Sequence, residues 1–428
     1  MAHFKLKDGM LLGVATAATQ IEGGDRANSW YDWAETGHIK DGSSPVRADG
    51  HWERVREDTE LMADMGLQIY RFSVEWSRIE PQKGEFSEEA LEHYRRELQG
   101  LRENGIRPLM TLHHFTNPRW FERMGAFEHP QAPELFLRFV EKTVRALGDL
   151  CGEYVTINEP NVYAFSGLLA GEWPPGKQDF GAVTRAYRTF TQCHIRAYKL
   201  IHRLRREMGF EETKVGVANS LRVFSPLERD NPYHRFLANA GDVLFQGSLT
   251  RAMMTGECRF PVPEAGEPLG RYYDFIGINY YSRTTMHRAA NDTRPGTPRN
   301  DLDWEVYPRG IALLAKAMYE KYKAPIWITE NGAADSRDAF RARYIYEHLK
   351  ALCELDVPVE RYYHWCFIDN FEWLEGESAR FGLVHIDYET QERTVKQSGY
   401  FFSEIIENGG VTEDMYRRYV AGQRYEIK

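Results

Sequence analysis

Gly66-Leu67-Gln68-Ile69-Tyr70-Arg71-Phe72-Ser73-Val74 is a run of β-forming residues that predicts a buried strand. Just before it, Val55, Met62 and Met65 recur at helical spacing. Gly66 stands where a glycine commonly ends a helix in the left-handed conformation. Because the next helical pattern follows within a few residues, this stretch predicts an α/β protein with a parallel sheet.

The same alternation of helix and strand continues along the chain. Leu91, Leu98 and Leu101 recur at helical spacing before Gly105, and Pro133 begins a further helix that leads to a short strand. Strands are expected at residues 11–15, 66–74, 107–114, 154–158, 214–219, 274–280, 325–330 and 362–367. This repeat predicts a closed (β/α)8 barrel of the TIM type with extended βα loops, and we expect residues 1–428 to form one domain.

An open, doubly wound sheet is the alternative arrangement of such units. The first expected strand is not followed by Gly-x-Gly-x-x-Gly, the pattern typical of dinucleotide-binding folds of that type. Stretches rich in proline and charge at residues 173–176 and 291–303 predict long loops after the fourth and sixth strands, not linkers between domains. The pattern therefore favours the barrel.

Composition excludes several classes of protein. The 428 residues are 42% hydrophobic and 27% charged, which is typical of a globular protein. No window approaches the roughly 18 consecutive apolar residues of a membrane span. The net charge is −9, and we expect the short run Arg203, Arg205 and Arg206 on the solvated face of a helix. Neither a membrane nor a nucleic acid is therefore an expected partner.

The amino-terminal residues and the cysteines indicate the compartment. Residues 1–9 lack the apolar core of a secretory signal. The cysteines are odd in number and never spaced as Cys-x-x-Cys, which argues against a disulfide framework and against a zinc site. They are Cys151, Cys193, Cys258, Cys353 and Cys366. We expect reduced, buried thiols in a cytoplasmic protein.

Two glutamates stand where β-rich runs end. Glu159 lies in Thr156-Ile157-Asn158-Glu159-Pro160, and Glu330 lies in Ile328-Thr329-Glu330-Asn331-Gly332. Active sites of TIM barrels are built at the carboxyl ends of the strands. Although the two glutamates are 330 − 159 = 171 residues apart in sequence, a closed barrel would bring them to the same rim.

Two carboxyl groups at one rim are what hydrolysis of a glycosidic bond requires. At roughly 5 Å apart, one carboxylate attacks the anomeric carbon while the other protonates the leaving oxygen. At roughly 6.5 to 9.5 Å a water fits between them and the configuration inverts. A purely structural role, in which two unrelated glutamates cap loops or pair with arginines, is the alternative from these residues alone.

Further motifs accompany the two glutamates in a characteristic order. They are Gly13-Val14-Ala15-Thr16-Ala17-Ala18-Thr19-Gln20-Ile21-Glu22-Gly23, Arg71-Phe72-Ser73-Val74-Glu75-Trp76-Ser77-Arg78, Gly277-Ile278-Asn279-Tyr280-Tyr281, Trp304-Glu305-Val306-Tyr307-Pro308 and Asp369-Asn370-Phe371-Glu372-Trp373. Together with the two glutamate motifs, the chain resembles glycoside hydrolase family 1, the retaining β-glucosidase family, along most of its length.

The resemblance implies a role for each reacting group. Glu330 would be the nucleophile, with Arg71 lowering its pKa and Tyr281 donating a hydrogen bond to it. Glu159 would act first as general acid and then as general base, which requires a raised pKa. Asn158 would bond the sugar 2-hydroxyl, an interaction that strengthens in the transition state.

The resemblance also implies the residues that hold the sugar ring. Trp365 would form the floor on which the ring stacks. The other substrate-binding residues implied are Gln20, His114, Asn158, Asn279, Glu372 and Trp373. His114 lies in Leu112-His113-His114-Phe115, where the family commonly has Trp after this histidine.

The activity implied is that of a retaining exo-β-glycosidase. It would release terminal β-D-glucosyl residues, with side activity on β-galactosyl or β-fucosyl residues, from small-molecule β-glycosides or short oligosaccharides by a double displacement. No cofactor or metal is expected, since the sequence has no P-loop and no His-x-x-x-His pattern. A homo-oligomer is compatible with these features. The alternatives are a catalytically silent sugar-binding protein on the same barrel and a transglycosylase.

Overall fold

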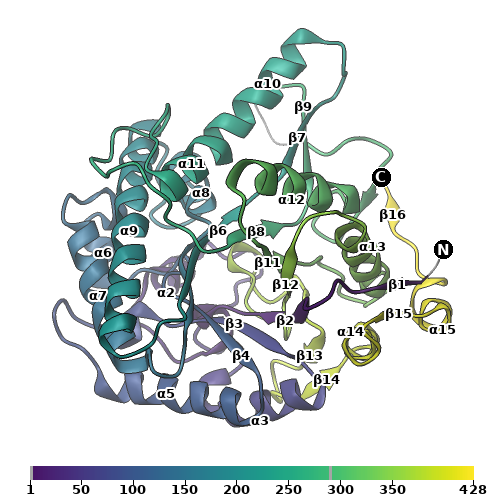
Figure 1. Ribbon diagram of the computed structural model, residues 1–428, viewed down its shortest axis with the longest axis horizontal. Helices are drawn as coiled ribbons and strands as arrows, with labels where there is room; N and C mark the ends of the chain where they lie inside the picture. The colour runs from purple at the N-terminus through teal and green to yellow at the C-terminus, as the bar shows by residue number, and fades with distance from the viewer. Residues whose placement is uncertain (1–2, 289–291) are drawn as a thin grey trace.

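A closed barrel of parallel strands forms the centre of the molecule (Figure 1). The computed structural model describes residues 3–288 and 292–428, so residues 1–2 and Asn291, on which two expectations fall, lie outside the described residues. Within these ranges, eight strands close in the order β11-β12-β2-β3-β4-β5-β6-β8. They are β2 (Leu11–Ala15), β3 (Ile69–Ser73), β4 (Arg107–Thr111), β5 (Glu153–Asn158), β6 (Lys214–Ser220), β8 (Ile276–Tyr280), β11 (Ile326–Asn331) and β12 (Val359–Trp365). The predicted (β/α)8 barrel is confirmed, and the open sheet is wrong.

Each barrel strand is followed by a helix of the outer layer (Figure 1). In chain order these helices are α3 (His51–Asp64), α5 (Glu88–Glu103), α7 (Ala132–Leu147), α9 (Phe180–Glu207), α11 (Ser248–Thr255), α12 (Pro308–Tyr322), α13 (Arg341–Cys353) and α14 (Gln397–Asn408). Further helices lie outside this layer: α1 (Ala18–Ile21), α2 (Ser29–Glu35), α4 (Trp76–Ile79), α6 (Arg119–Arg123), α8 (Pro160–Val162), α10 (Pro232–Asp242) and α15 (Glu413–Met415).

The local signals that end the helices act as predicted. Gly66, after α3, has φ +70°, and Gly105, after α5, has φ +72°, a region that glycine adopts without a steric clash. Pro133 lies in the first turn of α7. The face of α5 that carries Leu91, Leu98 and Leu101 is buried. These signals fix where each helix ends and where the chain turns toward the next strand.

One expectation about α9 is wrong. Arg203 and Arg206 are exposed, but Arg205 is only 5% exposed. Its guanidinium donates hydrogen bonds to the carbonyl oxygens of Gly148 and Glu212. Buried backbone carbonyls outside a helix, such as that of Gly148 just past α7, need hydrogen-bond donors. The charged side chain of Arg205 is buried because it supplies these donors.

Within the described ranges, four two-stranded sheets and several short 3-10 and π-helical segments lie outside the barrel. The sheets pair β1 (Phe4–Lys5) with β15 (Gly410–Val411), β10 (Pro298–Arg299) with β16 (Glu426–Ile427), β13 (Val384–Ile386) with β14 (Arg393–Val395), and β7 (Val223–Pro226) with β9 (Arg283–Met286). The helical segments are η1 (Ala126–Glu128), η2 (Tyr163–Ala170), η3 (Val243–Gly247), η4 (Trp373–Glu375) and η5 (Tyr416–Val420). Long connections after β5 and β8 confirm the predicted loops, and α10 projects outward above β7 and β9 (Figure 1).

The cysteines are free, as expected, and differ in burial. Cys151, Cys193 and Cys366 are buried, whereas Cys258 and Cys353 are half-buried. Among residues 3–288 and 292–428, no helix combines the length and the apolarity needed to cross a membrane.

Candidate active site

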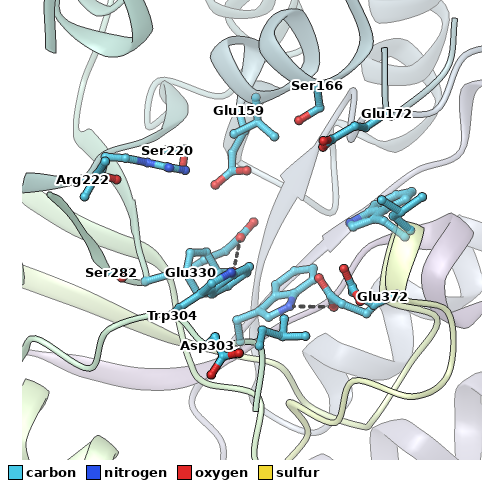
Figure 2. Close-up of a pocket in the computed structure, with 18 of the residues that line it drawn as sticks. Glu159, Ser166, Glu172, Ser220, Arg222, Ser282, Asp303, Trp304, Glu330 and Glu372 are labelled. Carbon is cyan, nitrogen blue, oxygen red and sulfur yellow. Dashed lines mark hydrogen bonds between the residues drawn. The ribbon is translucent and has the colours of Figure 1, made fainter. Parts of the chain in front are cut away.

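A cavity of about 690 Å³ opens at the rim where the barrel strands end (Figure 2). Glu159 follows β5 and Glu330 lies near the end of β11, and both line this cavity. Both side chains are largely buried, with residue exposures of 7% and 3%. The barrel thus brings to one cavity the two carboxyls that the sequence separates by 171 positions.

The backbone holds Glu159 in an unusual conformation. Its φ of +42° lies in the left-handed region, which costs a non-glycine residue free energy. Its N–H donates to the carbonyl of Ala218 on β6 at 2.7 Å, and the preceding N–H of Asn158 donates to the carbonyl of His113 at 2.8 Å. Pro160 then begins α8 directly. These constraints turn the Glu159 side chain out of the strand and into the cavity.

Two donors grip the Glu330 carboxyl. Arg71, from β3, donates to Oε1 from Nη1 at 2.5 Å, and the Tyr281 hydroxyl donates to Oε2 at 2.6 Å. The Arg71 side chain is fully buried, and its Nε also donates to Thr111 Oγ1 at 3.0 Å. Charge-assisted bonds of this kind fix the position of a carboxyl group and favour its ionised form.

Amide side chains connect the two carboxyls. Asn279 Nδ2 donates to Glu159 Oε1 and to Asn158 Oδ1, each at 3.0 Å, and its Oδ1 accepts from Thr329 Oγ1 at 2.6 Å. Arg71 Nη2 donates to the same Asn158 oxygen at 2.6 Å. Since Arg71 also binds Glu330, one continuous network links both glutamates.

Burial raises the pKa of both carboxyls. The charge of Glu330 adds to the rise at Glu159, whereas the donors at Glu330 oppose the rise there. Burial and then the charge of Glu330 raise the pKa of Glu159 to about 8. Burial also raises the pKa of Glu330, while Arg71 and Tyr281 oppose that rise. Arg71 therefore acts in the expected direction, but the net pKa of Glu330 is raised because desolvation outweighs the guanidinium. Because Arg71 and Tyr281 stabilise the charged form of Glu330, and a charge on Glu330 disfavours a second charge on Glu159, the pair holds its first negative charge on Glu330.

The far end of the cavity carries a third carboxyl. Glu372 Oε2 accepts from Gln20 Nε2 at 3.3 Å and from Trp365 Nε1 at 3.4 Å. Burial raises the pKa of Glu372 to about 8, with the charge of Glu330 adding to the rise. Burial, together with nearby Arg71, holds the pKa of His114 well below its usual range, so this imidazole is neutral. The end is therefore polar but carries little net charge.

Two polar atoms at this end have no partner among the described residues. They are Gln20 Oε1 and His114 Nδ1, both buried. Beside them the rings of His114 and Trp365 stack at 5.6 Å between centroids. Buried polar atoms are normally satisfied, so these two fit a ligand that offers hydroxyl groups.

Comparisons with known proteins agree with this geometry. The model of "Glycosyl hydrolase family 1" matches residues 2–411. The chain belongs to glycosyl hydrolase family 1. Beta-glucosidase A of Thermotoga maritima is 32% identical over 448 aligned residues, covering 96% of this chain and 99% of that protein. This family 1 chain is thus a glycoside hydrolase, a conclusion that rests on the match over residues 2–411.

Solved family 1 structures superpose closely on this one. A beta-glycosidase from Pyrococcus horikoshii gives a TM-score of 0.89 at 33% identity, covering 97% of this chain and 98% of the other. The beta-glucosidase from Thermotoga maritima in complex with glucoimidazole gives 0.86 at 30% identity, covering 95% and 100%. The similarity extends over the barrel and its loops together.

The structure gathers every predicted site residue of this family 1 protein into one region. Those that line the cavity are His114, Glu159, Tyr281, Glu330, Trp365, Glu372 and Trp373. The others, Gln20, Arg71, Asn158 and Asn279, lie directly behind them and hydrogen-bond to them or to each other. Asn279 is 0% exposed and its amide binds protein partners, which favours a role in positioning Glu159.

Sequence reasoning did not single out several lining residues. Arg222 and Ser220 come from the end of β6, and Glu172 and Ser166 come from the connection after β5 (Figure 2). None of them belongs to a motif quoted above. The available signal was positional: residues that directly follow a barrel strand face the rim.

Proposed function

We propose that this protein is a retaining exo-β-glycosidase that hydrolyses terminal non-reducing β-D-glucosyl residues. The observation that carries the proposal is the asymmetry of the carboxyl pair. Glu330 is gripped by Arg71 and Tyr281, whereas Glu159 has a pKa raised to about 8 and faces the same cavity. One group suits attack as a carboxylate and the other suits proton donation.

The first step would transfer the sugar to the protein. A Glu330 oxygen attacks the anomeric carbon, the bond to the leaving oxygen breaks, and the Glu159 proton moves to that oxygen. Esterification removes the negative charge of Glu330, so the pKa of Glu159 falls. In the second step Glu159 takes a proton from water, the water oxygen attacks the anomeric carbon, and Glu330 leaves as a carboxylate.

Asn158 and the cavity end with Glu372 would recognise the sugar. Asn158 Nδ2 lies 3.0 Å from His114 Nε2 and carries a second hydrogen for the 2-hydroxyl. Gln20, His114 and Glu372 offer acceptors and donors for the outer hydroxyls, with Trp365 beneath the ring. Relatives named beta-glucosidase, one of them solved with glucoimidazole, support glucose as the main glycone. Weaker action on β-galactosides and β-fucosides belongs to the same proposal.

Three further parts of the proposal concern the domain organisation, the partners and the compartment of the enzyme. Residues 1–428 would act as one domain, since the family match extends over residues 2–411. Small-molecule β-glycosides or short oligosaccharides would be its partners, as the size of the cavity supports. The free cysteines are in keeping with a reducing compartment such as the cytoplasm.

Product stereochemistry tests the proposal. We expect turnover of p-nitrophenyl β-glucoside, with β-glucose as the first product in proton NMR spectra recorded before mutarotation. Slower turnover is expected for the β-galactoside and β-fucoside. First release of α-glucose would indicate inversion, and absence of turnover with all three substrates would favour a sugar-binding protein. A transglycosylase would instead give mainly glycoside products when an acceptor alcohol is added.

A further inference from the structure

Arg222 is a cation that lines the cavity and has no role in the proposed reaction. It follows β6, and its backbone is clamped by Gln246, which accepts from Arg222 N–H at 2.9 Å and donates to its carbonyl at 3.0 Å. The guanidinium lies over the ring of Phe245, 4.5 Å from its centroid. Backbone and side chain are thus both held, so the guanidinium has a defined place.

The charge of Arg222 is not neutralised within the protein. In the part of the chain that the structure describes, no carboxylate lies within 4.0 Å of its guanidinium. Two other cations that line the cavity are paired: Arg283 with Glu305 at 2.5 Å, and Lys40 with Glu375 at 2.5 Å. Burial lowers the pKa of Arg222 and the charge of Glu159 opposes this. Arg222 is half-buried, and a half-buried cation without a carboxylate partner favours an anionic group in the ligand.

The position of Arg222 selects which part of a substrate it meets. Figure 2 shows Arg222 pointing toward Glu159 from the side opposite Glu372. Under the function proposed above, Glu372 contacts the sugar and Glu159 protonates the leaving oxygen. A group beyond Glu159 is therefore part of the aglycone. Ser220 and Ser282 line the same cavity, and the Ser282 hydroxyl donates to the carbonyl oxygen of Glu305 at 2.9 Å.

We propose that Arg222 selects β-glucosides whose aglycone carries a carboxylate. A guanidinium presents a planar fork that matches a carboxylate, and the resulting bond is stronger than one between neutral groups. Before the reaction Glu159 is protonated and does not repel such an aglycone. Removing a hydrogen bond to a charged group costs roughly 10- to 100-fold in affinity or rate. This inference rests on the proposed glycosidase activity and narrows its substrate class.

A matched substrate pair tests the inference. The β-glucosides of 4-hydroxybenzoate and of its methyl ester differ in one negative charge, and the quantity measured is the ratio of their kcat/KM values, acid over ester. We expect Arg222→Gln to lower this ratio by roughly 10- to 100-fold relative to the wild type. Arg222→Lys should give an intermediate ratio, because an ammonium keeps the charge but loses the fork.

Arg235→Gln is the matched control for the loss of one positive charge. Arg235 is exposed on α10 and does not line the cavity. We expect the wild-type ratio in this variant. An Arg222→Gln ratio within twofold of the wild type, with both substrates slowed equally, would overturn the inference and leave Arg222 a structural residue. A ratio that falls as far in Arg235→Gln as in Arg222→Gln would overturn it equally, because the effect would then come from net charge alone.

Two readouts separate this inference from the proposed function and from misfolding. Wild-type turnover of the neutral ester reports on the glycosidase alone, so its absence would refute the proposed function. Inhibition of the wild type by free aglycones needs no variant: 4-hydroxybenzoate should inhibit at a concentration roughly tenfold lower than its methyl ester. Equal inhibition by the two, or stronger inhibition by the ester, would count against Arg222 as the selecting group.

Discussion

Individual hydrogen bonds decide which of the two carboxyls is suited to act as nucleophile and which as proton donor. Both glutamates are buried, which by itself would leave both protonated near neutral pH. Arg71 and Tyr281 donate hydrogen bonds to Glu330, whereas the donor to Glu159 is the Asn279 amide, and the charge of Glu330 raises the pKa of Glu159. The roles proposed for the two groups therefore depend on which donors reach which oxygen.

Tyr281→Phe tests the grip on Glu330. Without the 2.6 Å hydroxyl bond, the pKa of Glu330 rises further, because its charged form loses a donor. The acid limb of the kcat/KM profile should move to higher pH, with a loss of about tenfold at the optimum. Tyr400→Phe, at a site that is 50% exposed on α14, is the control. An acid limb that stays in place in Tyr281→Phe would contradict the account.

Glu159→Ala tests the proton donor. For a β-glucoside with a poor leaving group, kcat/KM should fall roughly 10²- to 10⁴-fold, the usual contribution of general acid catalysis. A dinitrophenyl glucoside needs no proton, so it should still form the intermediate and show a burst of phenol. Added azide should then give the β-glucosyl azide, identified by NMR. An α-azide would exchange the roles of the two glutamates.

At the scale of elements, the end of β11 must pass very close to β12. A Cβ atom on Gly332 would lie 1.8 Å from the carbonyl oxygen of Trp365, so the two chain segments meet where only glycine fits. Gly332 directly follows the strand that carries Glu330, and Trp365 ends the next one. The close approach thus sets the spacing between the nucleophile and the proposed sugar platform.

Gly332→Ala should therefore affect both stability and activity. Overpacking of this kind costs roughly 1–3 kcal/mol, and the displaced strand ends should lower kcat/KM because Glu330 moves relative to Trp365. Urea unfolding followed by tryptophan fluorescence measures the first effect, and aryl glucoside turnover the second. Gly422→Ala, where a Cβ meets nothing within 4 Å, is the matched control. Equal behaviour of the two variants would refute the packing argument.

The elements differ in how well the sequence predicts them. All the barrel strands were predicted, because apolar runs alternate with helical patterns whose ends carry signals such as Gly66 after α3 and Pro133 at the start of α7. The β7–β9 pair was not, since its short strands pair only through the tertiary fold. Arg205 and the net pKa of Glu330 escaped prediction for the same reason, because burial is decided by distant segments. The two glutamates were found because each lies in a motif, whereas Arg222 lies in none.

At the scale of the whole molecule, pH dependence reports the coupling of the carboxyls. The proposed first step needs Glu159 protonated, and its pKa is raised to about 8. Activity should therefore be retained below that pH and lost as pH rises through about 8. The kcat/KM profile for an aryl β-glucoside measures this, with recovery of activity after return to pH 7 as the control for unfolding. A profile with no alkaline limb up to pH 10, or with an alkaline limb centred below pH 6, would contradict the assignment.

The central claim is that Glu330 bonds covalently to the sugar while Glu159 handles the proton. Its most direct test uses dinitrophenyl 2-deoxy-2-fluoro-β-glucoside. Loss of the 2-hydroxyl contact slows both steps, while the good leaving group speeds only the first, so the intermediate accumulates. The account predicts that mass spectrometry of the digested protein finds one fluoroglucosyl group, on the peptide and residue of Glu330. A label on Glu159, or no label on a protein that releases α-glucose from its substrates, would contradict it.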